Sequence, residues 1–300
     1  MKTQINEFLN HLMIEKGSSG NTIQAYRNDL YQLEDYLKNN RDFDDPNDLD
    51  STTLSKFVLT LQEKSYTRST IARKIASIKS FLTFLVREGI LHQNPSDNLS
   101  APKIGRTLPT PISEEEINRL LDSAGAGHSL ESLRDKAMLE ILYATGMRVS
   151  EMVSLDQNDI NLSEGYVKCM GKGAKERLIP IHDSANQAIT DYIDTARPNL
   201  IGNPREPALF VNQRGERLTR QGFWLILKAH ARRAGIQSPV TPHTLRHSFA
   251  THMLQGGASL RQVQEFLGHS SIASTQIYTL LTNTHLRSEF EKAHPRAHRI

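Results

Sequence analysis

Histidine and arginine side chains gather where one helix is expected to begin, in the string HTLRHSFATHML (residues 243–254). Thr241, Pro242 and His243 have the types typical of a helix N-cap and its first two positions, and a helix N-terminus attracts anions. Arg246 follows His243 by three residues and therefore shares its face of the helix. An imidazole ring and a guanidinium placed together in this way can bracket a phosphate group.

His243 and His247 also have the i, i+4 spacing of a zinc-binding pair. A zinc site of that kind needs a third ligand, and usually a glutamate after the first histidine, where this chain has Thr244. The anion interpretation is therefore favoured, and we expect no metal and no other cofactor.

Two more strings carry cationic side chains. ATGMRVSE places Arg148 after a glycine that would end a helix, with Glu151 one turn further on as an orienting partner, although an isolated arginine there is usually half of a surface ion pair. GKGAKER offers Lys172 and Lys175 at the tip of an expected hairpin. It is not a phosphate-binding P-loop, because Gly173 stands where that motif requires serine or threonine.

The string LGHSSIASTQIYT contains His269 and, nine residues later, Tyr278. A lone tyrosine among apolar neighbours is most often a core residue. A phenol can also attack a phosphodiester, provided that cations neutralise the phosphate and another group helps with the proton, since its pKa is near 10.

Taken in order, these four strings resemble the tyrosine recombinase family, and the ending NTHLRSEFEKAHPRA resembles its Xer branch. The resemblance covers nearly the whole chain. It implies that the nucleophile is Tyr278, the arginine pair Arg148 and Arg246, the histidines His243 and His269, and the hairpin lysine Lys172. Leu280 departs from the pattern, because many Xer relatives have a histidine there.

The resemblance also implies a metal-free reaction through a covalent 3′-phosphotyrosine, in which strands are exchanged one pair at a time within a tetramer. The arginines would grip the phosphate, His243 and His269 would assist the attack, and Lys172 would protonate the leaving oxygen. Lys175 competes with Lys172 for that role, and we otherwise assign it to DNA binding. Because the covalent bond stores the energy of the broken one, ATP is not expected.

The implied fold is mainly α, with an N-terminal four-helix SAM-like DNA-binding domain and an α+β tyrosine recombinase catalytic domain that has a small antiparallel sheet. Apolar residues do recur at helical spacing in four N-terminal segments, 5–13, 23–37, 54–61 and 71–85.

Arg73, Ser80 and Arg87 lie seven residues apart and form a polar ridge on the fourth of these helices. A ridge of this kind is either a solvated face or a set of phosphate contacts that position a protein on DNA.

Residues 94–111 contain four prolines and no hydrophobic period, which predicts a linker between domains at 1–93 and 112–300. Ser113 and Glu116 then form a capping box that starts a new helix. We expect strands over 166–170 and 177–181, with a third over 209–211, and helices from Thr219 onward.

The composition excludes several protein classes. Three hundred residues with a single cysteine, Cys169, exclude a disulfide scaffold, and the absence of a long apolar run excludes a transmembrane helix. The formal net charge of +3 is too small to identify a partner. We expect a cytoplasmic protein.

Three functions remain open: a Xer-type recombinase that resolves chromosome dimers at a dif-like site, a mobile-element integrase or resolvase with the same chemistry, and a DNA-binding protein without catalysis. The complete set of six residues argues against the third, and the compact chain favours the first. The expected partners are a double-stranded DNA site, a homo- or hetero-tetramer with a second recombinase, and a cell-division DNA translocase as activator. Residues 285–300 would be a frayed tail or, as the resemblance implies, a helix that docks on a neighbouring protomer.

Overall fold

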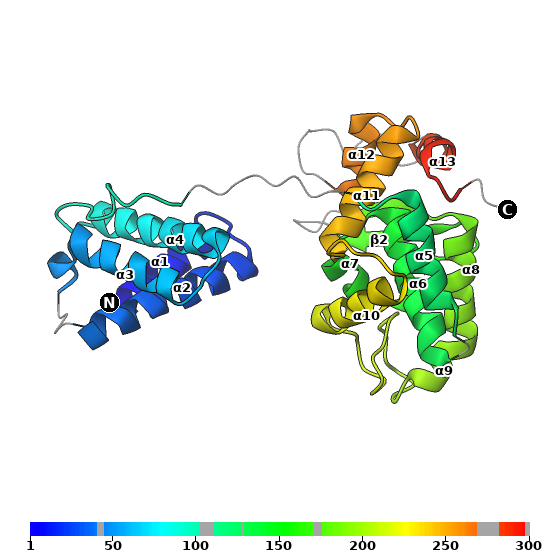
Figure 1. The fold of residues 1–300 in the computed structure, drawn as a ribbon, viewed down its shortest axis with the longest axis horizontal. Helices are drawn as coiled ribbons and strands as arrows, with labels where there is room; N and C mark the ends of the chain where they lie inside the picture. Colours follow the sequence, from blue (N-terminus) through cyan, green and yellow to red (C-terminus); the bar gives the residue numbers. More distant parts are fainter. Residues whose placement is uncertain (41–44, 103–110, 128, 171–175, 269–281, 298–300) are drawn as a thin grey trace. The chain divides into compact units, whose positions relative to one another are not determined.

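The computed structural model describes residues 1–40, 45–102, 111–127, 129–170, 176–268 and 282–297, with the side chains of Asn40 and residues 282–287 left out. The chain divides into two compact units, Met1–Thr107 and Leu108–Ile300 (Figure 1). Within the described part of the chain, no helix is both long and apolar enough to cross a bilayer.

The first unit confirms the four predicted helices. They are α1 (Lys2–Ile14), α2 (Gly20–Asn40), α3 (Ser51–Glu63) and α4 (Arg68–Arg87), with a short 3₁₀ turn over Pro46–Asp48. The side chains of Asp50 and Thr67 cap the N-termini of α3 and α4. The apolar stripes bury one common core, in which the Phe8 ring packs against Phe81 and Phe84. Met13 is the exception to the predicted stripe, because it is 55% exposed at the end of α1.

The second unit is mostly helical. Its helices are α5 (Glu114–Gly125), α6 (Leu130–Thr145), α7 (Val149–Ser154), α8 (Asp183–Asp191), α9 (Arg197–Leu200), α10 (Arg220–Arg233), α11 (Pro242–Gln255), α12 (Leu260–Leu267) and α13 (Thr282–Ala293), with a 3₁₀ turn over Gln157–Asp159 and a π-helical turn over Tyr192–Ala196. The predicted capping box of Ser113 and Glu116 starts α5. From Ala137 to Thr145 every residue of α6 is buried, so this helix is the centre around which the others pack.

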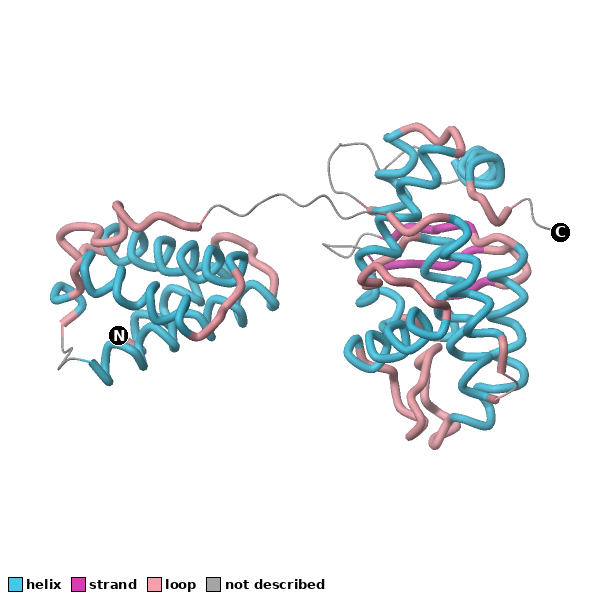
Figure 2. Tube along the Cα trace, in the orientation of Figure 1, coloured by secondary structure: helices cyan, strands magenta, loops and turns pink. Residues whose placement is uncertain are grey.

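The sheet has the strand order β1-β2-β3 and is antiparallel throughout. Its strands are coloured magenta in Figure 2. Strands β2 (Tyr166–Met170) and β3 (Glu176–Pro180) confirm the predicted hairpin, with the second strand shifted by one residue. Val167, Cys169 and Ile179 turn inward from it and are fully buried.

The predicted third strand over residues 209–211 is wrong, since the third strand is β1 (Ile160–Asn161). Around Ala208 and Val211 the backbone forms isolated bridges with Asp156 and Arg217. The carbonyls of Ala208 and Leu209 accept hydrogen bonds from the Arg197 guanidinium instead of from a neighbouring strand. The Arg197 side chain therefore satisfies the hydrogen-bonding capacity of these two carbonyls, which the sequence pattern predicted would bond to a neighbouring strand.

The end of the chain packs onto the second unit, so a frayed tail over the described residues 288–297 is wrong. Phe290 and His294 are buried, and the His294 ring stacks on Phe290. Arg296 donates to Glu140 at 2.8 Å and to Asn118 at 3.1 Å. Glu140 is fully buried, and Arg296 is the cation that partners it.

Candidate active site

Arg148 occupies the sharp turn between α6 and α7. The turn begins at Gly146, which ends α6 in the left-handed conformation with φ of 58°. A side chain at this position would place its Cβ 2.2 Å from the Phe249 ring, and the left-handed backbone also disfavours other residues. The residue that ends α6 must therefore be glycine. Arg148 then serves as N-cap of α7, and its side chain is 44% exposed.

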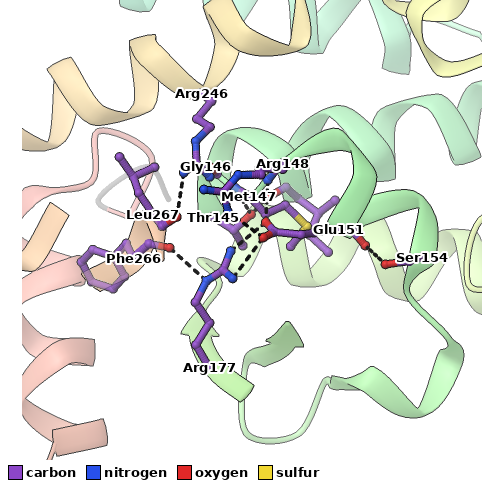
Figure 3. Close-up of polar contacts among 11 residues, drawn as sticks. Thr145, Gly146, Met147, Arg148, Glu151, Ser154, Arg177, Arg246, Phe266 and Leu267 are labelled. Carbon is purple, nitrogen blue, oxygen red and sulfur yellow. Dashed lines mark hydrogen bonds and ion pairs between the residues drawn. The ribbon is translucent and has the colours of Figure 1, made fainter. Parts of the chain in front are cut away.

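The predicted contact between Glu151 and Arg148 is present. One carboxylate oxygen accepts a hydrogen bond from the Arg148 backbone N–H at 2.7 Å, and the other accepts one from its guanidinium at 2.9 Å. Arg177 of β3 donates to both oxygens as well, at 2.8 and 3.2 Å (Figure 3). Burial alone would raise the pKa of Glu151, but the hydrogen bonds from Arg177 and Arg148 outweigh it and hold that pKa below its usual value.

Arg246 reaches the same place from α11. Its guanidinium donates to the Gly146 carbonyl at 2.7 Å and to the Leu267 carbonyl at 2.6 Å, while the residue as a whole is only 8% exposed (Figure 3). Burial, and after it the nearby Arg148, lower the pKa of Arg246 to about 10. The guanidinium therefore remains a cation at neutral pH.

His243 lies at the N-terminus of α11, as predicted. Thr241 caps the helix and exchanges hydrogen bonds with Thr244, and Pro242 fills the first position. The His243 side chain is exposed. The start of α11 lies beside the two arginines, because Thr241, Pro242 and His243 line the same cleft as Arg148 and Arg246.

Arg148, His243 and Arg246 line one cleft of about 620 Å³. Its other described lining residues include Arg220, Gln221 and Trp224 from the first turns of α10, and none of the described lining residues is acidic. These α10 residues were missed at the sequence level. The signal that could have found them is the i, i+4 spacing of Arg220 and Trp224 directly after the N-cap Thr219.

Four of the predicted site residues, Lys172, Lys175, His269 and Tyr278, lie outside the described residues. Among the described ones, no group of three or more histidine, cysteine or acidic side chains could hold a metal ion. A cleft walled by guanidinium groups and a helix N-terminus suits a phosphodiester, whose charge must be neutralised before an anionic nucleophile can approach.

The predicted ridge on α4 has charged partners within its own unit. Arg73 and Lys74 both bind the buried carboxylate of Asp29, Lys74 at 2.8 Å. Arg87 donates to Glu88 at 3.0 Å and lies over the Phe84 ring. Arg73 and Arg87 are nonetheless about half exposed, and Ser80 between them is half-buried. The ridge is therefore open to solvent, and Asp29 holds the side chain of Arg73 in place.

Comparisons with known proteins show which family the chain resembles. Residues 111–285 match the phage integrase family, and residues 5–89 match the N-terminal SAM-like domain of phage integrases. The tyrosine recombinase XerC of Herpetosiphon aurantiacus is 50% identical over 94% of this chain and 92% of its own. The tyrosine recombinase XerD of Oceanobacillus iheyensis is 47% identical over 98% of each chain.

Solved structures share the fold. XerH recombinase bound to a palindromic difH substrate in a post-cleavage complex superposes with a TM-score of 0.70, at 23% identity over 97% of this chain and 89% of the other. The same recombinase bound to difH before cleavage gives a TM-score of 0.66, at 25% identity over 89% of this chain and 78% of the other.

Proposed function

This chain belongs to the phage integrase family of tyrosine recombinases, and from that premise we propose that it resolves chromosome dimers by recombination at a dif-like site. Members of this family cleave and rejoin DNA through a tyrosine nucleophile, so the chain is a strand-exchanging enzyme. The specific role in chromosome segregation rests on its likeness to XerC and XerD along nearly the whole length of both proteins.

The observation that carries the catalytic proposal is the meeting of Arg148 and Arg246 in one cleft. The two residues are 98 positions apart in the sequence, and the Gly146 carbonyl joins them, since it accepts from Arg246 and lies two residues before Arg148. We assign both guanidiniums to the non-bridging oxygens of the scissile phosphate. They neutralise its charge and favour the five-coordinate transition state, in which more charge develops on those oxygens.

Tyr278 is the proposed nucleophile. Its phenolic oxygen forms a bond to phosphorus as the bond to the 5′ oxygen breaks, which leaves a 3′-phosphotyrosine and a free 5′ hydroxyl. His243, exposed at the start of α11, accepts the phenolic proton, and His269 donates a hydrogen bond to the phosphate. Lys172 gives a proton to the departing oxygen. Attack by a 5′ hydroxyl of the other duplex reverses each step and reseals the strand without ATP.

The proposed substrate is a double-stranded DNA site bound by a tetramer, either of this chain alone or with a second recombinase. Each protomer would close around the duplex, with the ridge of Arg73, Ser80 and Arg87 on one unit, the arginine cleft on the other, and residues 94–111 as the linker. Lys175 would add a DNA contact. A cell-division DNA translocase is the proposed activator, and the chromosomal substrate places the reaction in the cytoplasm.

Covalent capture in the host tests this function. Protein would be purified from cells under denaturing conditions, and the DNA that remains attached would be sequenced. We expect one chromosomal site made of two inverted half-sites around a short spacer. Capture at the ends of mobile elements would instead establish the integrase or resolvase alternative. DNA that is recovered after reversible crosslinking but never in the covalent form would establish a DNA-binding protein without catalysis.

A further inference from the structure

We propose that Arg177 is a positioning residue of the strand-cleavage reaction, which ties the carboxylate that holds Arg148 to the backbone just before His269. The proposal rests on the function proposed above and adds a residue to it. Arg177 does not line the arginine cleft, and its side chain is only 14% exposed. Its effect on the phosphate must therefore pass through other residues.

The first of its contacts is with Glu151. The two terminal nitrogens of Arg177 take one carboxylate oxygen each, which is the paired geometry that a planar guanidinium and a carboxylate favour. The same carboxylate also holds the side chain of Arg148 at 2.9 Å. One buried anion is thus shared between two cations, one at the cleft and one behind it.

This sharing has a consequence for Arg148. With Arg177 present, Glu151 divides its charge and its lone pairs between two guanidiniums. Without Arg177, both oxygens would be free to pair with Arg148 alone, which would draw that guanidinium toward Glu151 and neutralise it. The positive charge of Arg148 would then be compensated more fully by Glu151, and its guanidinium would lie in a poorer position for the phosphate.

The second contact is with the end of α12. The Nε of Arg177 donates to the Phe266 carbonyl at 3.3 Å. The guanidinium also lies against Gly268, where an added Cβ would come within 3.0 Å of a terminal nitrogen. Gly268 ends α12 in the left-handed conformation, with φ of 66°, and His269 follows it directly. Arg177 therefore packs against the end of α12, directly before His269 in the sequence.

Arg246 makes a similar contact with the end of α12, since it donates to the neighbouring Leu267 carbonyl at 2.6 Å. Two consecutive carbonyls at the end of α12 are thus fixed by two arginines, one of which is in the cleft. Arg177 adds β3 to this arrangement, and β3 begins directly after Lys175 in the sequence. No lysine could replace it, because a single ammonium cannot span two carboxylate oxygens and a carbonyl in this fixed geometry.

The test measures covalent adduct formation by the full-length protein on a synthetic duplex of the captured site, nicked beside the scissile phosphate. Arg177→Ala should form the adduct about 10- to 100-fold more slowly, by analogy with the loss on removing the residues that orient metal ligands in metal sites. Arg177→Lys should restore less than half of the loss on a logarithmic scale. DNA affinity should stay close to wild type for both variants. Both should remain folded in the assay buffer, although Arg177→Ala should lower the midpoint of urea unfolding because Glu151 loses a partner.

Arg217→Ala is the matched control. Arg217 is also partly exposed, donates to the Val153 and Leu155 carbonyls, and pairs with Asp156 in the same unit, but it does not contact Glu151 or α12 in the described contacts. This variant should keep the wild-type rate of adduct formation. A loss in Arg217→Ala equal to that in Arg177→Ala would overturn the proposal, as would an unchanged rate in Arg177→Ala.

A second substrate separates positioning from a loosened fold. Replacing one non-bridging oxygen of the scissile phosphate with a methyl group removes its negative charge, so attack depends less on the arginines. On this methylphosphonate, the rates of adduct formation of wild type and Arg148→Ala should differ less than on the phosphate. The difference in rate between wild type and Arg177→Ala should become smaller as well. An equal deficit of Arg177→Ala on both substrates would refute action through Arg148. If wild type itself forms no adduct on the duplex with the unmodified phosphate, the proposed function fails instead.

Discussion

Acid should destabilise the catalytic unit through His294, which anchors the end of the chain. The residue is fully buried, and its Nε2 lies 3.2 Å from the Tyr143 carbonyl, to which it donates. Its Nδ1 accepts from the Arg296 backbone N–H at 3.2 Å. Both ring nitrogens are thus satisfied in the neutral form. Burial lowers the pKa of His294 to about 3, although the hydrogen bond to Tyr143 opposes the shift.

The size of the effect follows from proton binding. Below pH 6.5 the unfolded chain protonates this histidine, but the folded chain does not until the pH approaches 3, so acid favours unfolding across that window. Between pH 7 and pH 5 the loss is about 2 kcal/mol, from about 1.4 kcal/mol for each pH unit below 6.5. The His182 ring packs against His294 in a tilted arrangement with ring centroids 4.8 Å apart, and burial lowers the pKa of His182 to about 2. Protonation of His182 should lower the free energy of unfolding by a similar amount between pH 7 and pH 5.

Urea unfolding at pH 7 and pH 5 measures the difference. Trp224 is the one tryptophan and lies in the catalytic unit, so its fluorescence follows that unit. The loss of unfolding free energy on acidification should be about 2 kcal/mol smaller in His294→Gln than in wild type. The control His243→Gln changes an exposed ring and should keep the wild-type loss. An equal loss in wild type and His294→Gln would refute a neutral, proton-excluding His294.

Two further predictions concern DNA. Arg73→Ala and Arg87→Ala should weaken DNA binding and each reduce the slope of log affinity against log salt by about one, because each removes a phosphate contact; unchanged slopes would make the ridge a solvated face. Lys172→Ala should cleave slowly, and a substrate with sulfur in place of the bridging 5′ oxygen should restore its rate, because a thiolate leaves without a proton. Rescue of Lys175→Ala in its place would exchange the roles of the two lysines, and rescue of neither would remove both from proton transfer.

Local signals predicted most of the helices. The caps at Thr219 and Thr241 and the helix stop at Gly146 lie within a few residues of the groups they satisfy, so the sequence alone locates them. The partnership of Arg148 with Glu151 was predictable for the same reason, because one helical turn separates the two residues.

Contacts between distant residues were not predictable. Asp29, which fixes Arg73 from 44 residues away, and Glu140, which binds Arg296 from 156 residues away, have no local signature of burial. Arg177 looked like an ordinary strand residue, since its partners come from two other elements. A two-residue strand such as β1 carries too short a pattern to detect, and the sheet was therefore assigned the wrong third strand.

The identity of the nucleophile is the central claim, and a nicked suicide duplex tests it most directly. Wild-type protein should form a protein–DNA adduct that survives denaturation, and it should do so in EDTA. Tyr278→Phe should bind the same duplex with unchanged affinity and form no adduct, while Tyr166→Phe, a half-buried tyrosine of β2, should form it normally. A denaturation-resistant adduct formed by Tyr278→Phe would contradict the account.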